Sequence, residues 1–192
     1  HYPLRRQRQM CIRDSVLEGK TLREISSITK DIKLPKGRLE RIFHEKNPIY
    51  IDYAHTPEAL ECALKEIRRS HEGLIWCLFG CGGDRDKQKR PLMGSVAEQY
   101  ADVVVLTNDN PRREDEKAII SDILSGIESS EDILIFPDRR EAIEKILTEF
   151  KKSSNKDVLL IAGKGHESHQ NIGNELLEFN DKDIVSEFLK TK

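Results

Sequence analysis

Short apolar runs alternate with amphipathic stretches along the chain from Ile49 onward. The apolar runs predict strands over residues 48–53, 74–79, 102–107, 132–136 and 157–162, with a weaker candidate at 175–179. The stretches of helical period predict helices over residues 57–69, 91–100, 114–127, 138–150 and 181–189. Patterns that alternate in this way predict an α/β fold, a mostly parallel sheet of about six strands with helices on both faces.

The first 47 residues lack this alternation. Residues 16–47 predict a short helical or irregular piece, and Leu34, Pro35 and Gly37 are typical of a linker that enters the α/β domain. Residues 1–15 are basic, lack the apolar core of a signal peptide and a starting methionine, and resemble translated adapter sequence. We therefore expect residues 1–15 to be non-native, the natural chain to extend further upstream, and the α/β domain to comprise residues 48–192.

The composition narrows the class of protein without indicating a ligand. The 192 residues suffice for one domain of ordinary size, and 37% apolar with 34% charged residues is typical of a soluble globular protein. No apolar run is as long as a membrane span, and a net charge of -2 indicates neither nucleic acid nor an anionic membrane as a partner. Cys11, Cys62, Cys77 and Cys81 do not form two CxxC pairs, which favours reduced cytosolic thiols over a metal cluster.

Four loops that follow predicted strands carry most of the unusual polar residues. They are DYAHTP (52–57), FGCGGDRDKQKRP (79–91), NDNPRRED (108–115) and GKGHE (163–167). In an open parallel sheet, ligands bind beyond the carboxyl ends of the strands, where loops and helix amino termini converge. We therefore expect the functional site at this edge of the sheet.

The loop at 79–91 combines Gly80, Gly82 and Gly83 with several cations, which is the combination that an anionic ligand requires. Arg85 stands where the third glycine of a GxGxxG motif would be, so the loop does not predict a dinucleotide site. A solvated charged loop without a ligand is the alternative interpretation.

The remaining loops offer charged side chains of both signs. In NDNPR, Pro111 stiffens a turn that presents Arg112, whose guanidinium is suited to bidentate binding of a carboxylate. In GKGHE, Lys164 suits an anion and Glu167 suits an ammonium group. An ordinary turn is the alternative for NDNPR, because Asn, Asp and Pro are common turn formers. His55 precedes a predicted helix cap and fits a capping or core histidine as well as a functional one.

Six short motifs together resemble one family. They are GRLE (37–40), DYAHTP (52–57), FGCGGDRDKQKRPLMG (79–94), NDNPR (108–112), DRREAI (138–143) and AGKGHE (162–167). In this order and spacing they resemble the carboxyl-terminal region of the Mur ligases, in particular the branch that adds meso-diaminopimelate, over residues 34–191 with a weaker trace at 16–33. The resemblance implies a Rossmann-like domain that receives the incoming amino acid, preceded at residues 16–47 by the tail of a central ATPase domain and a linker.

The resemblance also implies a reaction. Ligases of this branch add meso-diaminopimelate to UDP-MurNAc-L-Ala-D-Glu during peptidoglycan synthesis in the cytoplasm, with ATP and Mg²⁺ as cofactors. ATP phosphorylates the D-glutamate carboxylate, and the amine of diaminopimelate attacks the resulting acyl phosphate. The P-loop pattern GxxxxGK(S/T) is absent, since Asp14 occupies the position of its first glycine before Gly19, Lys20 and Thr21. We therefore expect the chain alone not to turn over ATP, and we assign no catalytic residue or metal ligand within it.

Matched position by position, the resemblance assigns a set of residues to meso-diaminopimelate: Arg85, Asp109, Asn110, Pro111, Arg112, Gly163 and Glu167. Arg112 is implied to hold the distal carboxylate, which L-lysine lacks, and the lysine-adding relatives lack this arginine. A buried charge without its partner is costly, so this contact can discriminate strongly between the two amino acids. Arg38, Asp52 and His55 match positions that face the nucleotide.

Other functions stay open on the sequence alone. The chain fits a free-standing, non-catalytic module that binds an amino acid, which the upstream coding sequence would distinguish from a ligase. It also fits a relative of the same architecture that adds lysine to the same precursor or glutamate to folate. Arg112 disfavours lysine, and the combined GDRD and DNPR sequences disfavour folate.

Overall fold

The computed structural model describes residues 16–21, 23–25, 35–42, 47–129 and 133–191. The chain divides into two compact units, His1–Pro35 and Lys36–Lys192. In the described part of the first unit, the Thr21 N–H donates to Glu24 Oε2 (2.8 Å) and the Glu24 N–H donates to Thr21 Oγ1 (3.4 Å), which caps a short helical turn. The segment that we expect to be non-native, residues 1–15, lies outside the described residues.

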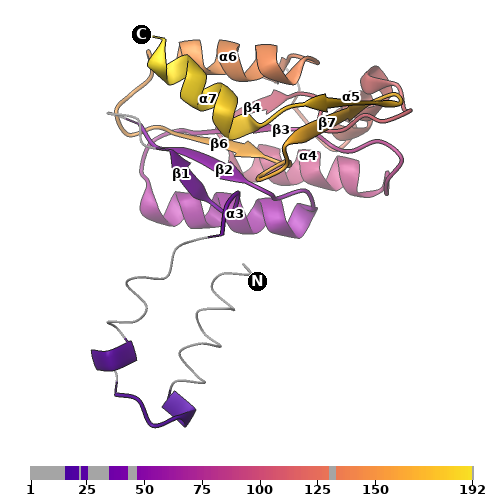
Figure 1. Cartoon of the computed structure of the whole chain (residues 1–192). Helices are drawn as coiled ribbons and strands as arrows, with labels where there is room; N and C mark the ends of the chain where they lie inside the picture. Colours follow the sequence, from indigo (N-terminus) through magenta and orange to yellow (C-terminus); the bar gives the residue numbers. More distant parts are fainter. Residues whose placement is uncertain (1–15, 22, 26–34, 43–46, 130–132, 192) are drawn as a thin grey trace. The chain divides into compact units, whose positions relative to one another are not determined.

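The second unit is built on a six-stranded sheet (Figure 1). Its strands are β1 (Glu40–Ile42), β2 (Ile49–Asp52), β3 (Ile75–Phe79), β4 (Val103–Leu106), β5 (Leu134–Ile135) and β6 (Val158–Ala162). The strand order is β1-β2-β6-β3-β4-β5, and neighbouring strands are parallel except for β1, which pairs antiparallel with β2. The predicted mostly parallel α/β sheet is therefore confirmed.

Helices cover both faces of this sheet, as the sequence predicted (Figure 1). They are α3 (Pro57–Ser70), α4 (Lys89–Tyr100), α5 (Glu116–Leu124), α6 (Arg139–Phe150) and α7 (Asp181–Lys190). Helices α3, α4 and α5 pack in a row on one face, and α6 and α7 pack on the other. Because the central strands lie between two helical layers, successive side chains such as Cys77, Leu78 and Phe79 are all fully buried.

Side chains cap the first turns of several helices, and the sequence indicated one of these caps, Thr56. The Ala59 N–H donates to Thr56 Oγ1 (3.3 Å) at the start of α3, and the Glu141 N–H donates to Asp138 Oδ1 (2.7 Å) at the start of α6. Asn180 caps α7 in the same way. Side-chain caps satisfy N–H groups that have no partner within the helix, so these helices begin at defined residues beside the strand ends.

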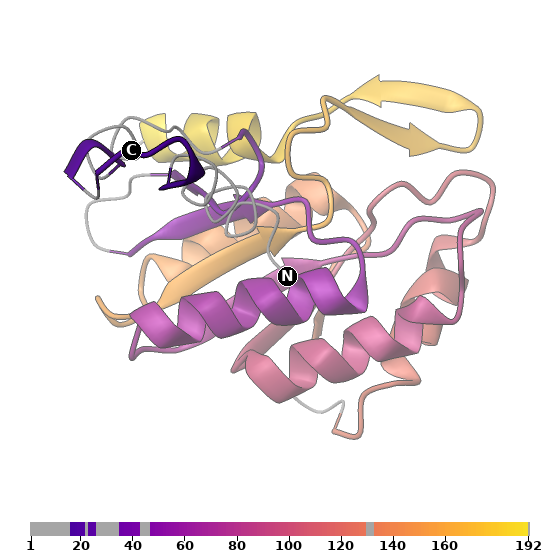
Figure 2. The ribbon, with the colours of Figure 1, turned by 90° about the horizontal axis from the view of Figure 1, so that it is seen from below.

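The weak strand candidate at residues 175–179 does form a strand, but it does not join the main sheet. It is β8 (Glu175–Glu178), which pairs antiparallel with β7 (His169–Ile172) in a separate hairpin (Figure 2). The sequence did not predict β7, because the segment from His169 to Asn171 is polar and has no apolar alternation. The side chains of Leu176 and Leu177 stay 64% and 44% exposed on this hairpin.

The sixth strand of the main sheet comes from an unexpected place. β1 lies within residues 16–47, where the sequence predicted only helical or irregular structure, and the second unit begins at Lys36. Other boundaries differ by a few residues: α4 begins at Lys89, α5 spans Glu116–Leu124, and β5 comprises Leu134–Ile135, with residue 132 of its predicted range outside the described residues. The division at 47/48 that we expected for the natural domains stays a prediction.

Candidate functional site

The loops that follow β4 and β6, together with the β7–β8 hairpin, line an open pocket of about 400 Å³. Its lining is Asn110, Arg112, His166, Glu167, Ser168, His169, Asn171 and Leu176. We call this the strand-end pocket. It lies at the sheet edge where parallel strands end, as the sequence predicted, and it contains three of the residues that the resemblance assigned: Asn110, Arg112 and Glu167.

Arg112 and Glu167 bring opposite charges to the walls of the strand-end pocket. Arg112 lies on a turn with φ of 53° and its Nη1 donates to the carbonyl oxygen of Gly83 (2.7 Å). Glu167 Oε2 accepts hydrogen bonds from Asn110 Nδ2 (2.9 Å) and Lys164 Nζ (2.9 Å). Burial alone would raise the pKa of Glu167, but these hydrogen bonds and the nearby cations Lys164 and Arg112 lower it overall. Glu167 is therefore ionised near neutral pH and suited to an ammonium group.

Lys164 is fully buried beneath the strand-end pocket. Its Nζ donates to Asn110 Oδ1 (3.0 Å), Glu167 Oε2 (2.9 Å) and the carbonyl oxygen of His169 (2.7 Å). An ammonium group has three N–H donors, and these acceptors use all of them. The sequence-based suggestion that Lys164 suits an anionic ligand is therefore wrong, because the side chain points into the protein and is already satisfied.

One face of the β7–β8 hairpin forms a wall of the strand-end pocket. In the hairpin register His169 opposes Glu178 and Asn171 opposes Leu176, so these side chains share a face. His169, Asn171 and Leu176 all line the pocket. The hairpin is tied to the turn after β4 because the Arg112 N–H donates to the Asn171 carbonyl (3.0 Å) and the Asn171 N–H donates to Asn110 Oδ1 (2.9 Å). The sequence did not predict this wall of the pocket, because it did not predict strand β7.

The glycine loop at 79–91 packs against the loop after β4 and not around the pocket. A methyl group at Gly80 would overlap the carbonyl oxygen of Thr107, and one at Gly83 would overlap that of Pro111. These glycines thus allow close approach of two protein loops, where the sequence suggested close approach to an anion. Arg85 is exposed and does not line the pocket, although its Cγ lies near Gly82, as does the Nη1 of Arg112.

Three other assigned residues, Asp109, Pro111 and Gly163, are buried and do not line the pocket. Asp109 is 8% exposed, and burial raises the pKa of its carboxyl while the charges of Arg139 and Lys164 oppose that change. Its Oδ2 lies where a side chain at residue 163 would begin, and Gly163 has φ of 111°, so only glycine fits there. These residues belong to the same loops as the lining residues, and their direct contact with an amino acid stays a prediction.

The positions expected to face a nucleotide lie around Tyr53. The guanidinium of Arg38 lies 4.9 Å from the Tyr53 ring centroid, and the rings of His55 and His166 lie 4.5 and 5.3 Å from it. His166 also lines the strand-end pocket, so the two groups of residues adjoin. Asp52 is instead buried, and its carboxylate accepts hydrogen bonds from the N–H groups of Leu39 (2.6 Å) and Ala54 (2.8 Å). A role of these residues toward a nucleotide stays a prediction.

A buried arginine that sequence reasoning missed holds the loops of the site in place. Arg139 of the DRREAI motif binds Asp181 through Nε and Nη2, both at 2.8 Å. It also donates to the carbonyl oxygens of Asn108 (3.2 Å) and Ala162 (2.9 Å), where the loops after β4 and β6 begin. The motif was visible in the sequence, but the partner lies 42 residues away, so no local pattern indicated the ion pair.

A second buried arginine, Arg90, joins the glycine loop to the segment before α5. Its guanidinium donates to Glu114 (2.9 and 3.1 Å), to Asp122 (2.8 Å) and to the carbonyl oxygen of Gly82 (3.2 Å). The hydrogen bonds from Arg90 are the main cause that lowers the pKa of Glu114 from 4.5 to about 2, against the opposing effect of burial.

We expect the Glu114 carboxylate to make stability depend on pH. A carboxyl group whose pKa is lowered by folding stabilises the protein above its unfolded pKa, and this contribution is lost as the pH falls through the folded pKa. The difference in unfolding free energy between the natural chain and Glu114→Gln should therefore be largest near pH 7 and shrink between the pKa values of 4.5 and about 2. Urea unfolding of both proteins from pH 7 to pH 2.5 measures it.

The matched control is Glu58→Gln, because Glu58 is exposed in the first turn of α3. Its unfolding free energy at pH 7 should stay within about 0.5 kcal/mol of the natural chain. A gap between the natural chain and Glu114→Gln that is constant across the whole pH range would contradict the expected linkage.

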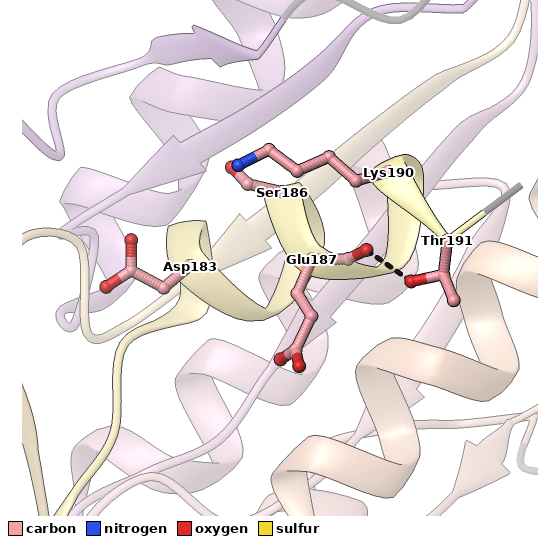
Figure 3. A pocket seen from close by; sticks show the side chains of 5 residues that line it. All are labelled: Asp183, Ser186, Glu187, Lys190 and Thr191. Carbon is pink, nitrogen blue, oxygen red and sulfur yellow. Dashed lines mark hydrogen bonds between the residues drawn. The ribbon is translucent and has the colours of Figure 1, made fainter.

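Another hollow, of about 440 Å³, lies along α7 near the end of the chain (Figure 3). Its described lining consists of Asp183, Ser186, Glu187, Lys190 and Thr191. These side chains point in different directions from one helix, and none is buried (Figure 3). The hollow therefore lacks the converging polar groups of a binding site.

Two of the described cysteines, Cys77 and Cys81, are buried. Burial raises the pKa of Cys77 and of Cys81 to about 12 each. The Cys81 thiol contacts the sulfur of Met93 at 3.6 Å, which supports packing as its role. Among the described residues, no group of three or more His, Cys, Asp or Glu side chains is arranged to hold a metal ion, and no helix is long and apolar enough to cross a membrane.

The family described as Mur ligase, glutamate ligase domain, matches residues 37–165. The chain belongs to the Mur ligase family. The match covers β1 to β6 and ends within the loop that follows β6, so it includes the whole main sheet and, of the residues that line the pocket, Asn110 and Arg112. The β7–β8 hairpin lies beyond the matched residues.

Relatives of this Mur ligase chain include two proteins with the same name, UDP-N-acetylmuramoyl-L-alanyl-D-glutamate–2,6-diaminopimelate ligase. The one from Haemophilus influenzae strain 86-028NP is 47% identical over 173 residues, which is 90% of this chain and 35% of the relative. The one from Buchnera aphidicola subsp. Acyrthosiphon pisum is 45% identical over 172 residues, or 89% of this chain and 34% of the relative. The chain thus spans about a third of the length of these relatives.

A solved structure of a ligase with that name superposes with a TM-score of 0.76 at 36% sequence identity. The superposition covers 93% of this chain and 36% of the solved chain. The relatives found by sequence and this solved structure therefore carry the same name.

Proposed function

We propose that this Mur ligase chain binds meso-diaminopimelate in the strand-end pocket, as part of a cytoplasmic ligase that joins it to UDP-MurNAc-L-Ala-D-Glu in peptidoglycan synthesis. The observation that carries the proposal is the placement of a guanidinium, Arg112, and a carboxylate, Glu167, on the walls of one pocket of about 400 Å³. The similarity to relatives that are named as 2,6-diaminopimelate ligases supports the proposal.

The charges of the strand-end pocket fit the chemistry of this amino acid. Meso-diaminopimelate carries an ammonium group and a carboxylate at each end, so Glu167 can accept from an ammonium while Arg112 binds the distal carboxylate in bidentate fashion. L-Lysine has no distal carboxylate and leaves the guanidinium without a partner. We therefore propose that Arg112 discriminates between the two amino acids.

ATP and Mg²⁺ belong to the proposal as cofactors of the ligase reaction, in which ATP supplies the phosphate that makes the D-glutamate carboxyl group reactive. The cluster around Tyr53 fits a nucleotide chemically, because an aromatic ring can stack on a base and the Arg38 guanidinium suits a phosphate. We assign no Mg²⁺ ligand to this chain. Its own contribution to the reaction is to bind the attacking amino acid and to orient its amine.

A titration followed by ¹⁵N NMR tests the binding step on the full 192-residue chain. We expect meso-diaminopimelate to shift the Asn110 side-chain amide and the backbone signals of Arg112 and Glu167 in a saturable way. L-Lysine should need concentrations at least about tenfold higher for the same effect, because it lacks the Arg112 contact. Equal binding of both amino acids, or shifts confined to other regions, would contradict the proposed site.

The ligase reaction itself is tested by a chimera in which residues 36–191 of this chain replace the residues aligned with them in the Haemophilus influenzae relative. We expect release of ADP that depends on both UDP-MurNAc-L-Ala-D-Glu and meso-diaminopimelate. A chimera that folds and binds diaminopimelate but forms no product would favour a non-catalytic binding module.

A further inference from the structure

The buried ammonium of Lys164 connects three segments of the chain that each form a wall of the strand-end pocket. Asn110 belongs to the turn after β4, Glu167 to the loop after β6, and the carbonyl of His169 to the hairpin. These acceptors use all three N–H donors of the ammonium group, so none is left for a ligand. The Lys164 ammonium group uses all its donors inside the protein and joins three walls of the strand-end pocket. These contacts indicate that Lys164 positions the walls and does not bind the ligand.

The same contact determines which way the Asn110 amide faces. Its Oδ1 accepts from Lys164 Nζ (3.0 Å) and from the Asn171 N–H (2.9 Å), so both donors require the oxygen on that side. The Nδ2 group consequently points to Glu167 Oε2 (2.9 Å). Oε2 thereby receives two donors, while Oε1 of Glu167 makes no hydrogen bond to any described residue.

We propose that Lys164 is a positioning residue that sets the carboxylate of Glu167 and the β7–β8 hairpin for a ligand with an ammonium group and a carboxylate. The role in binding meso-diaminopimelate rests on the proposed function. Lys164 holds Glu167 by one oxygen and leaves the other for the ligand, at a fixed place relative to Arg112. Loss of the Lys164 side chain therefore removes a contact that holds the β7–β8 hairpin, the Asn110 amide and the Glu167 carboxylate together.

The natural chain itself offers the first test, through ¹⁵N-labelled lysine and direct observation of the ammonium groups by NMR. A fully buried ammonium with three acceptors should show slowly exchanging Nζ protons, with scalar or exchange signatures of hydrogen bonds, before any ligand is added. Rapid exchange of the Lys164 protons with water would overturn the proposal. This test needs no variant and no ligand.

Substitution provides the second test, with Lys164→Met compared to Lys182→Met. Lys182 also pairs with a glutamate, Glu40 (2.6 Å), but it lies outside the strand-end pocket, so its loss is a matched control. We expect Lys164→Met to weaken meso-diaminopimelate binding roughly tenfold or more, because the Glu167 carboxylate loses its fixed position. Exchange of the Asn171 amide proton, which is held by Asn110 Oδ1, should also accelerate about tenfold. Lys182→Met should change neither quantity.

The outcomes separate this inference from the proposed function. If the natural chain does not bind meso-diaminopimelate, the proposed function fails, whereas the Lys164 ammonium protons and the Asn171 amide exchange still decide the positioning role. If Lys164→Met does not fold, the exchange rate of the Lys164 ammonium protons in the natural chain decides whether Lys164 has the positioning role. Equal effects of both substitutions on binding and on Asn171 exchange would overturn it, because they would reflect a general loss of stability.

Discussion

Replacing Arg139 with methionine is expected to lower the free energy of unfolding by about 3–5 kcal/mol, since it leaves a buried carboxylate without its partner. Asp181 and Arg139 are both fully buried, and the guanidinium also satisfies the carbonyl oxygens of Asn108 and Ala162. All of these acceptors would lose their donors in the variant, at a place that water does not reach. Urea unfolding of the natural chain and the variant, with linear extrapolation to water, measures the loss.

Arg140→Met is the matched control, because the same substitution is made one residue further along α6. The Arg140 side chain is 51% exposed and pairs with Glu144 (3.6 Å) and Glu187 (3.4 Å) at the surface. Exposed pairs contribute about 0–1 kcal/mol, so this variant should unfold near the natural midpoint. If both variants lost the same amount, the burial of Arg139 would not explain its role.

A double variant separates the destabilising effect of the unpaired Asp181 carboxylate from that of the hydrogen bonds lost with the Arg139 guanidinium. Arg139→Met combined with Asp181→Leu removes both charges, so part of the stability should return relative to Arg139→Met alone. The recovery should be incomplete, because Asn108 and Ala162 still lack donors for their carbonyl oxygens. No recovery at all would indicate that the lost backbone contacts, and not the unpaired Asp181, dominate.

Replacing Arg112 with alanine is expected to abolish the preference for meso-diaminopimelate over L-lysine. Removing one partner of a close charge pair costs about 2–5 kcal/mol of binding free energy, so the affinity for meso-diaminopimelate should fall at least about thirtyfold. The affinity for L-lysine should change little, since it has no distal carboxylate for Arg112. Competition between the two amino acids, followed by the Asn110 side-chain amide signal, measures the change in preference.

The neighbouring residue provides the control for this substitution. Arg113 is exposed and does not line the strand-end pocket, so Arg113→Ala should change the affinity by no more than about twofold. Arg112→Lys adds a second comparison, because it keeps the charge but cannot form a bidentate pair. If Arg112→Ala kept the preference for meso-diaminopimelate, another residue would have to bind the distal carboxylate.

Much of the fold was predictable because its signals are local. Residues 74–79 and 158–162 are apolar on both faces, as expected of a strand between two helical layers, and both runs form central strands. Thr56 and Asp138 mark helix starts because a short polar side chain before an amphipathic stretch can cap free N–H groups. Local patterns of this kind do not depend on the rest of the chain, so they can be interpreted without a structure.

The candidate site was predictable in part, for a different reason. Parallel strands that alternate with helices all end at one edge of the sheet, so the turns after β4 and β6 must lie near each other. This rule brought Asn110, Arg112 and Glu167 together in the strand-end pocket. The rule does not say which side chains of a loop face a ligand, and Asp109, Pro111 and Gly163 from the same loops are buried and do not line the pocket.

The sequence by itself determined the α/β class, the central strands, the helix caps and the loops that carry the site, because each of these follows from the residue types within a short segment. The tertiary structure alone decided the rest. Strand β7 forms from mainly polar residues beside the turn around Arg112, and Lys164 faces inward because its three acceptors come from separate segments. Arg139 pairs with Asp181, which lies 42 residues away in the sequence. A charged side chain is satisfied by whatever atoms the folded chain brings to it, and that environment is a property of the whole fold.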